Sequence, residues 1–262
     1  MLLAKILSTT DPSRYVVYQM LDYIKSGEGF KLTQKNINGL FLSKTEPSID
    51  SLYNHAHILG QDFSANDWRV ICNFFGESPF RIKMSNNQVA ESLLLAQGLA
   101  LKNISIAMVL PDLNSGDFDY ILPPEVKLQR VDNFQKLAQI KLIFAEAFNC
   151  SVADYDRKFG FLDQIILDDD NKHAGAFIVY VNDQPVSTGA YYAFTKFSLE
   201  NIGTIKSARG QGYAGLIVKA LLQEAKRLHY EEACLVSLEP GVPVYHKLGF
   251  LDLSKYSTYI KL

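Results

Sequence analysis

Residues 207–215 read SARGQGYAG and separate a predicted strand, LENIGTIKS (199–207), from a long amphipathic helix pattern, QGYAGLIVKALLQEAKRLHY (211–230). Glycines at 210, 212 and 215 let a backbone approach a ligand closely, because no Cβ is in the way. The unbonded N–H groups at the start of a helix, together with the helix dipole, attract phosphate oxygens. We therefore expect a phosphate-binding junction between a strand and a helix.

The letters GQGYAG within this stretch also match the dinucleotide-binding pattern G-x-G-x-x-G. A dinucleotide fold needs several further strand–helix units after its glycine loop, but only 47 of the 262 residues follow Gly215. It also needs an acidic residue at the end of the next strand, about 20 residues on. Glu239 comes too late for this role, and Glu231 and Glu232 precede the strand. The sequence therefore disfavours a dinucleotide-binding domain.

The residues around this junction predict an α/β fold with a mixed, mostly antiparallel sheet flanked by helices. One helix pattern, at 133–149, places six residues on a single apolar stripe: Phe134, Leu137, Ile140, Ile143, Phe144 and Phe148. Alternating residues on both sides of the turn 182–184 predict a β-hairpin. The expected order is a strand at 125–131, helices at 133–149 and 152–167, strands at 175–181, 185–194 and 199–207, a helix at 211–230, a strand at 233–238, a short helix closing at Gly249, and two last strands ending at 259–262.

The first half of the chain shows one clear unit. It consists of a strand at 80–85, a helix at 86–102 and a strand at 104–110. The ending of this unit is similar to the end of the chain, because Gly98 precedes Met108 by ten residues, as Gly249 precedes Tyr259. This similarity hints at an internal duplication.

A boundary is predicted where PDLNSGDFDYILPP (111–124) collects residues that favour turns. It divides the chain into two expected domains, 1–122 and 123–262. Neither side contains a low-complexity tract or a block of like charges, so both halves are expected to fold.

The composition is that of an ordinary folded protein, with 48% apolar residues, 21% charged residues and a net charge of −2. Without a positive field, neither nucleic acid nor a membrane is an expected partner. No run approaches the ~18 apolar residues needed to span a bilayer, and residues 1–15 lack the cleavage site of a secretory signal. Cys72, Cys150 and Cys234 are widely spaced, so we expect buried thiols in a reducing cytoplasm.

Two motifs together point to a known family. Arg209, Gly212 and Ala214 match the pattern [Q/R]-x-x-G-x-[G/A], and downstream PVYHKLGF places Tyr245 ahead of a Leu-Gly-Phe closure. In these features, residues 124–262 resemble the GNAT superfamily of acyl-CoA-dependent N-acyltransferases. The first half lacks the glycine pattern and resembles a degenerate copy of the same fold without its cofactor loop. The resemblance implies a tandem GNAT-like arrangement.

The resemblance also implies where acetyl-CoA, the expected co-substrate, binds. Backbone N–H groups of the glycine loop would hold its pyrophosphate. In the family, a bulge splays the preceding strand from the next one and opens a V-shaped cleft, in which residues 202–204 would bind the pantetheine arm and the acyl carbonyl. ACLVSL (233–238) would form the other wall. The implied cofactor-binding residues are Ile202, Gly203, Thr204, Arg209, Gly210, Gln211, Gly212, Tyr213, Ala214 and Gly215.

Two positions depart from the family pattern. Relatives often carry a Pro shortly before the motif Arg, where this chain has Lys206-Ser207-Ala208, and Glu239-Pro240-Gly241 stands where an Asn commonly contacts pantetheine.

Two residues are the candidates for proton transfer. Tyr245 matches the general acid of the family, and a phenol with an ordinary pKa of about 10 is protonated at pH 7 and can donate to a departing thiolate. Glu200 lies where many relatives place a carboxylate that acts as the base directly or through water, and Glu239 is the reserve candidate. His246 is disfavoured, because on a helix its side chain projects away from that of Tyr245.

Neither a metal site nor a covalent intermediate is expected. His55 and His57 share a face only if their segment is a strand, and no further ligand is spaced nearby. No cysteine falls in the predicted cleft with a partnered histidine, so the amine is expected to attack the thioester directly.

The sequence therefore predicts an N-acetyltransferase that moves an acetyl or other acyl group from acyl-CoA to a primary amine in a ternary complex. The acceptor is a small-molecule amine or a peptide or protein amine, the first half forms one wall of its site, and a homodimer is compatible with this organisation. The alternatives are a non-catalytic acyl-CoA-binding or sensor module, and a scaffold that keeps only the fold. The identity of the acceptor cannot be read from the sequence, because acceptor loops vary on a common cofactor half.

Overall fold

The computed structural model describes residues 16, 17, 19, 31–37, 39–46, 48, 50–85, 87–168 and 172–261. The stretch 1–15, used in the sequence argument, lies outside these residues. The strands are β1 (Lys31–Ile37), β2 (Leu40–Glu46), β3 (His55–Ile58), β4 (Arg81–Met84), β5 (Leu99–Leu110), β6 (Val126–Arg130), β7 (Ala174–Val181), β8 (Gln184–Ala193), β9 (Phe197–Thr204), β10 (Ala233–Leu238) and β11 (Leu251–Lys261). The α-helices are α3 (Ala65–Phe75), α4 (Gln88–Ala96), α5 (Phe134–Phe148), α6 (Val152–Phe159), α7 (Asp163–Leu167), α8 (Tyr213–Arg227) and α9 (Val242–Lys247).

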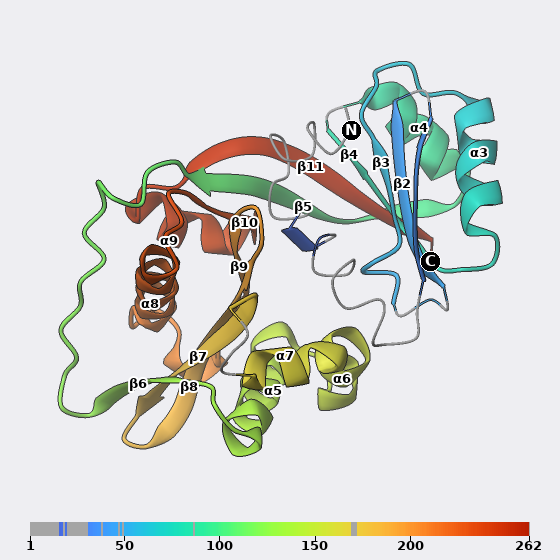
Figure 1. Cartoon of the computed structure of the whole chain (residues 1–262). Helices are drawn as coiled ribbons and strands as arrows, with labels where there is room; N and C mark the ends of the chain where they lie inside the picture. Colours follow the sequence, from blue (N-terminus) through green and yellow to red (C-terminus); the bar gives the residue numbers. More distant parts are fainter. Residues whose placement is uncertain are drawn as a thin grey trace.

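All described strands join one sheet in the order β1-β2-β3-β4-β11-β5-β10-β9-β8-β7-β6. The neighbours β3–β4 and β9–β10 are parallel and the other pairs are antiparallel. Successive residues of a strand point to opposite faces, so β8 sends Tyr192 into a core beside α5–α7 and Tyr191 into a second core beneath α8. A third core packs α3 and α4 against β2–β4 (Figure 1). The predicted mixed, mostly antiparallel sheet flanked by helices is confirmed.

The two halves of the chain repeat one succession of elements. Three antiparallel strands are followed by a helix, a parallel strand, a second helix and a last strand, first in β1–β2–β3–α3–β4–α4–β5 and again in β7–β8–β9–α8–β10–α9–β11. Gly98 and Gly249, at the equivalent helix ends, both have left-handed backbones, with φ of +79° and +90°. The structure thus repeats the pattern that hinted at an internal duplication.

The last strand of each half of the chain pairs with a strand of the other half within this one sheet. β5 is the last strand of the first half along the chain, but it pairs with β10 of the second half. This pairing includes all six residues of β10, from Ala233 to Leu238. β11 closes the second half but pairs with β4. β5 and β11 also pair with each other over most of their length, and they form the long bridge in the middle of the molecule (Figure 1). The division into domains 1–122 and 123–262 stays a prediction, and the structure adds that two strands cross between these halves.

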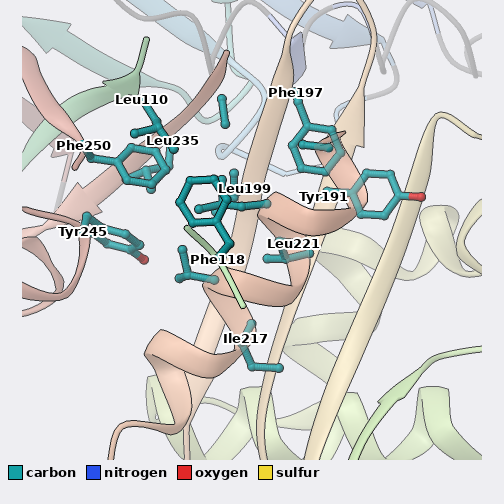
Figure 2. Packing of buried hydrophobic residues seen from close by; sticks show 14 of the residues in the cluster. Leu110, Phe118, Tyr191, Phe197, Leu199, Ile217, Leu221, Leu235, Tyr245 and Phe250 are labelled. Atoms are coloured by element: carbon teal, nitrogen blue, oxygen red, sulfur yellow. The ribbon is translucent and has the colours of Figure 1, made fainter. Parts of the chain in front are cut away.

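The predicted boundary segment is bound along α8. Lys219 Nζ donates to the Asp119 carbonyl at 2.7 Å, and Gln223 Nε2 donates to the Phe118 carbonyl at 3.2 Å. The Phe118 ring is buried in the core beneath α8 (Figure 2). The turn-forming residues therefore end the regular structure, while the connection between the halves remains part of the fold.

Several sequence predictions need correction. The end of the chain forms the single strand β11, because β4 and β5 pair with its two edges; two short strands were expected. The predicted helix at 152–167 is broken into α6, a 3-10 turn at Gly160–Leu162 and α7. The predicted helix at 86–102 ends as α4 at Ala96, since Gly98 turns the chain into β5. Among the cysteines, Cys234 is buried as expected, but Cys72 and Cys150 are half-buried.

Over the described ranges, no helix combines the length and apolar character of a membrane-spanning segment. His55 and His57 do share one face of a strand, with ring centroids 5.7 Å apart, but no group of three potential metal ligands occurs in this part of the chain.

Candidate active site

The parallel strands β9 and β10 stay paired for three residues only. Phe197, Ser198 and Leu199 pair with Ala233, Cys234 and Leu235. Beyond this point β9 continues to Thr204 beside β8, whereas β10 continues to Leu238 beside β5. We call the stretch in which these two strands no longer pair with each other, residues 200–204 of β9 opposite 236–238 of β10, the strand opening. Among the described strands, none pairs with this edge of β9 at residues 201–204.

A β-bulge lies at the start of the strand opening. Thr188 pairs with Gly203 and Ala190 with Glu200, so that two residues of β9, Asn201 and Ile202, stand opposite Gly189 alone. Asn201 has φ of +54°, a left-handed backbone that Asn tolerates better than most residues. Such a bulge bends and twists its strand. The bulge and the separation of the strands were both implied by the resemblance, and both are present.

The glycine loop at the end of β9 faces open space. Gly210 and Gly212 have φ of +77° and +87°, and a Cβ added at either of them, or at Gly215, would meet no atom within 4 Å. Gly212 is the N-cap of α8 and forms no side-chain cap hydrogen bond. The first N–H groups of a helix have no partner inside the helix. The loop thus has both the room and the donors that a phosphate group requires.

The equivalent helix start in the first half is closed. Ser64 and Asp67 form a capping box at the start of α3, in which Asp67 Oδ2 accepts from the Ser64 N–H at 2.9 Å and from the Ser64 hydroxyl at 2.6 Å. A carboxylate therefore already occupies the position that favours an anion. Of the two topologically equivalent loops, the one before α8 is open and the one before α3 is filled by its own side chains.

The predicted loop residues have different surroundings. Arg209 is exposed, and its guanidinium donates to the carbonyls of Thr204, at 3.2 Å, and Ala147, at 2.7 Å. These bonds tie the loop to β9 and to the last turn of α5. The Tyr213 hydroxyl donates to Gln211 Oε1 at 3.2 Å, and Ala214 lies half-buried in the first turn of α8.

The predicted strand residues lie tightly packed. A Cβ at Gly203 would come within 3.0 Å of both Ala147 and Phe148, so a larger residue there would require these side chains of α5 to shift. The Thr204 hydroxyl is 2.9 Å from that of Ser187 on β8. Ile202 packs at the border of the core beneath α8. These residues form a packed edge on one side of the strand opening.

Tyr245, on α9, lies within electrostatic reach of Glu200, on β9. Tyr245 lies on α9 beside Phe250, with ring centroids 5.8 Å apart, at the margin of the core in Figure 2. Burial raises the pKa of its phenol, and the charge of Glu200 raises it further. Glu200 is half-buried on β9 and accepts a hydrogen bond from the Ser198 hydroxyl at 2.6 Å. A phenol that stays protonated and a carboxylate thus lie within electrostatic reach of each other.

The other two residues considered for proton transfer, Glu239 and His246, are not part of this pair. Glu239 is exposed in the 3-10 turn after β10. His246 is also exposed, and its Nε2 lies 2.7 Å from Asp252 Oδ1 on β11, consistent with the expectation that it projects away. The sequence argument missed Ser198. The spacing of two residues between Ser198 and Glu200 on a predicted strand is the signal that could have placed both side chains on one face.

A buried charge network holds α8 against the sheet. Glu224, on α8, binds Arg130 at the end of β6 at 2.6 Å and Arg227 one turn later at 2.7 Å. The Tyr191 hydroxyl donates to the same carboxylate at 3.2 Å. Burial by itself raises the pKa of Glu224, but the hydrogen bonds and charges of Arg227 and Arg130 outweigh this and lower it. The network fixes the helix whose N-terminus forms the open loop.

Residues 137–250 match the model of the acetyltransferase (GNAT) family. This part of the chain is a GNAT domain. Similar solved structures include GCN5-related N-acetyltransferases from Kribbella flavida (TM-score 0.66, 14% identity, 95% of each chain covered) and Sphaerobacter thermophilus (TM-score 0.61, 11% identity, 91% of this chain and 84% of that chain covered). A tandem GNAT protein from the clavulanic acid biosynthesis pathway is also similar (TM-score 0.56, 11% identity, 88% of this chain and 83% of that chain covered). Comparison with curated proteins gave no match.

These similarities extend beyond the GNAT domain itself. Each of the three structures covers most of this chain, so the likeness of fold includes the first half. At identities of 11–14% the likeness concerns the fold alone. The predicted GNAT fold is confirmed, while the roles of individual residues in the strand opening stay predictions.

Proposed function

We propose that this protein is an N-acetyltransferase that transfers the acetyl group of acetyl-CoA to a primary amine. The observation that carries the proposal is the position of the strand opening directly before an open, uncapped helix start in a GNAT domain. The opening exposes backbone donors and acceptors along β9, and the loop exposes backbone donors at α8. Together they suit a long ligand with a phosphate-bearing segment and an extended amide arm.

In this proposal the chain binds acetyl-CoA mainly through its backbone. The N–H groups from Gly210 to Gly215 hold the pyrophosphate, since the added-Cβ positions of the glycines point into open space. The free edge of β9 at residues 202–204 binds the pantetheine arm and orients the acyl carbonyl. Arg209 holds the loop in place through the two carbonyls it already binds.

Glu200 and Tyr245 then divide the proton transfers. Glu200 accepts a proton from the ammonium group of the acceptor, and the free amine nitrogen attacks the acyl carbon, so that a C–N bond forms and the C–S bond breaks. Tyr245 donates its proton to the departing sulfur. The nitrogen sheds a second proton, which restores the phenol, and the net products are an amide, a free thiol and one proton.

The first half forms one side of the acceptor site in this proposal. It contacts α6 of the GNAT domain directly, because the Tyr53 hydroxyl donates to the Lys158 carbonyl at 2.6 Å and Asp50 lies 3.3 Å from Arg157. The acceptor would enter between these parts as a small-molecule amine or a peptide amine in the cytoplasm. In this proposal, side chains of the protein itself carry out the proton transfers, and no step uses a metal.

The test is a binding measurement followed by a screen. Acetyl-CoA is titrated calorimetrically into the full chain, and thiol release is then followed over polyamines, amino sugars, small amines and peptides. Binding together with amine-dependent thiol release supports the proposal. Binding without release on any acceptor class indicates a sensor module, and absence of binding indicates a scaffold; either result overturns the proposed transfer.

A further inference from the structure

The face of the sheet that carries the proposed base continues across the strand opening onto β10. Leu199 and Leu235, the last paired residues of β9 and β10, point into the core beneath α8 (Figure 2). Successive residues of a strand point to opposite faces, so Glu200 and Val236 both point to the other face of the sheet. Leu238 follows two residues after Val236 on β10 and therefore shares its face. Val236 and Leu238 thus form one wall of the strand opening.

Backbone pairing extends this wall from β10 to β5 and β11. Val236 pairs with Ala107 of β5, and Val109 lies two residues further along β5. Val109 pairs in turn with Leu251, the first residue of β11. Paired residues of neighbouring strands share a face, as do residues two apart within one strand, so all of these side chains lie on the face of Glu200. We call the four larger ones, Val109, Val236, Leu238 and Leu251, the apolar wall.

Much of the apolar wall is accessible to solvent. Leu238 is 46% exposed and Leu251 is 57% exposed, while Val109 and Val236 are half-buried. All four side chains consist of hydrocarbon alone. Single exposed leucines are common on protein surfaces, but contiguous apolar side chains on neighbouring strands are typical of binding sites.

The position of the apolar wall relates it to the acceptor. In the proposed reaction the acyl carbonyl lies against residues 202–204 of β9, and the amine nitrogen has to approach the acyl carbon to about 3–3.5 Å. Since β10 lies across the strand opening from these residues, the group attached to the amine nitrogen comes to lie beside Val236 and Leu238. A charged group there would lose water without gaining a counter-charge from the wall, whereas a hydrocarbon group gains from burial.

We propose that the acceptor is a primary amine borne on a hydrocarbon group, and that Val236 and Leu238 determine this specificity by contacting that group. The inference rests on the proposed function, because it names the class of acceptor for that reaction. It does not depend on whether Glu200 is the base, since it follows from the position of the wall beside the strand opening. Polyamines and amino sugars, which carry charged or polar groups near the reacting amine, are then poor acceptors.

Amines of matched length test the proposal on the full chain. Hexylamine, 1,6-diaminohexane and 6-aminohexanoate have the same number of carbons and end in a methyl, an ammonium and a carboxylate group. Thiol release at saturating acetyl-CoA gives kcat/KM for each amine. We expect hexylamine to exceed the other two by about tenfold or more. From propylamine to hexylamine, kcat/KM should rise about two- to fourfold per methylene, as expected for burial of hydrocarbon.

Substitutions in the apolar wall locate the discrimination. Leu238→Asp should lower kcat/KM for hexylamine about tenfold and narrow or reverse the preference over 1,6-diaminohexane, with unchanged acetyl-CoA affinity by calorimetry. Val236→Thr keeps the shape of the side chain and should also reduce the preference for hexylamine. Leu95→Asp is the matched control, because Leu95 is 51% exposed but lies on α4, which packs against the sheet of the first half. It should leave the ratio of the two amines unchanged.

The outcomes separate this inference from the proposed function. If no amine of any class releases thiol, acetyl transfer and the acceptor class inferred for it are both overturned. If 1,6-diaminohexane or glucosamine reacts faster than hexylamine, or the alkylamine series is flat, transfer stands and the hydrocarbon acceptor is wrong. An equal change of the amine ratio in Leu238→Asp and Leu95→Asp would contradict the role of the apolar wall, because it would show a general response to an added surface charge.

Discussion

Gly212 combines a left-handed backbone with empty space above it, and a side chain at this position would change both. Gly212→Asp adds a Cβ at φ of +87° and a negative charge beside the expected pyrophosphate. We expect acetyl-CoA binding to be lost. The stabilisation of about 2.7 kcal/mol expected at a hundredfold excess over Kd should then disappear. Calorimetry and thermal unfolding with and without acetyl-CoA measure this.

Gly98→Asp is the matched control for Gly212→Asp. Gly98 also has a positive φ, +79°, and open space around its Cβ position, but it lies before β5 in the other half of the chain. It should suffer the same backbone strain and keep its acetyl-CoA affinity. Unchanged affinity in Gly212→Asp would show that the loop does not hold the pyrophosphate.

Substitution of Tyr245 tests the proposed proton donor. Burial and the charge of Glu200 raise its pKa, so it stays protonated at least up to its ordinary value of about 10. Tyr245→Phe keeps the ring and removes the proton donor. We expect acetyl-CoA affinity to be retained and kcat to fall by about 10²–10⁴-fold, as for other lost acid–base groups.

A second tyrosine provides the comparison. The Tyr230 hydroxyl donates to the Phe194 carbonyl at 2.6 Å, away from the strand opening, so Tyr230→Phe should affect stability without slowing turnover. Full activity of Tyr245→Phe, measured where the chemical step is rate-limiting, would leave Tyr245 with a packing role alone.

Among the contacts between elements, Glu224 fastens α8 to β6 through Arg130 and to β8 through Tyr191, and it also binds Arg227 on its own helix. Its pKa is lowered in the folded state, so the stabilisation is present above the ordinary pKa of a glutamate and is lost as the pH falls through the folded value. Glu224→Gln should lower the free energy of unfolding by about 1–3 kcal/mol at pH 7, the range for lost charged hydrogen bonds.

Urea unfolding at pH 7 and at pH 3 measures this prediction. The difference in stability between wild type and Glu224→Gln should be largest at pH 7 and smaller at pH 3, which lies below the ordinary pKa of a glutamate, because the unfolded chain takes up a proton there that the folded carboxylate resists. A difference that stays constant between the two pH values would mean that the charge of Glu224 contributes nothing.

Elements with a strong periodic pattern were predictable from the sequence, and their caps explain why. α5 follows the apolar stripe of Leu137, Ile140 and Ile143 and begins at Asn133, whose side chain accepts from the Lys136 N–H. By contrast, β1 is polar and exposed along most of its length, so no alternation of apolar residues marks it as a strand. The break at Gly160 was missed because the apolar residues continue beyond it into α7.

The candidate site was predictable where it depends on backbone and not where it depends on side-chain partners. The glycine loop is marked by a motif with a fixed spacing, and the bulge was implied by the resemblance that this motif carries. The binding of Arg209 to the Ala147 carbonyl does not, because it joins residues 62 positions apart. The closure of the first-half loop by Ser64 and Asp67 was readable as a capping box, but only the structure shows that α3 is the counterpart of α8.

At the scale of the whole molecule, the exchange of strands bears on whether the GNAT half can stand alone. A fragment of residues 123–262 would lack β5, which pairs with both β10 and β11, and Phe118, which fills the core beneath α8. We expect this fragment to be poorly soluble, or to bind acetyl-CoA with loss of acceptor selectivity. Gel filtration, calorimetry and the amine screen check this.

Coexpression of residues 1–122 with residues 123–262 is the control. Because the cut lies in a surface connection while all strands remain present, the two pieces should assemble and recover the binding and selectivity of the full chain. A fragment 123–262 that is soluble, monomeric and as selective as the full chain would show that the first half is an independent domain.

The exchanged strands also set an order of events during translation. The first-half sheet ends at β4, and its native neighbour β11 begins at Leu251, 167 residues after Met84. At about 5–20 residues per second, the ribosome needs roughly ten to thirty seconds to deliver that strand. During this interval the edge of β4 is exposed on the nascent chain, and β5, already synthesised, is a competing neighbour. Completion of the first-half sheet therefore has to wait for the synthesis of nearly the whole second half.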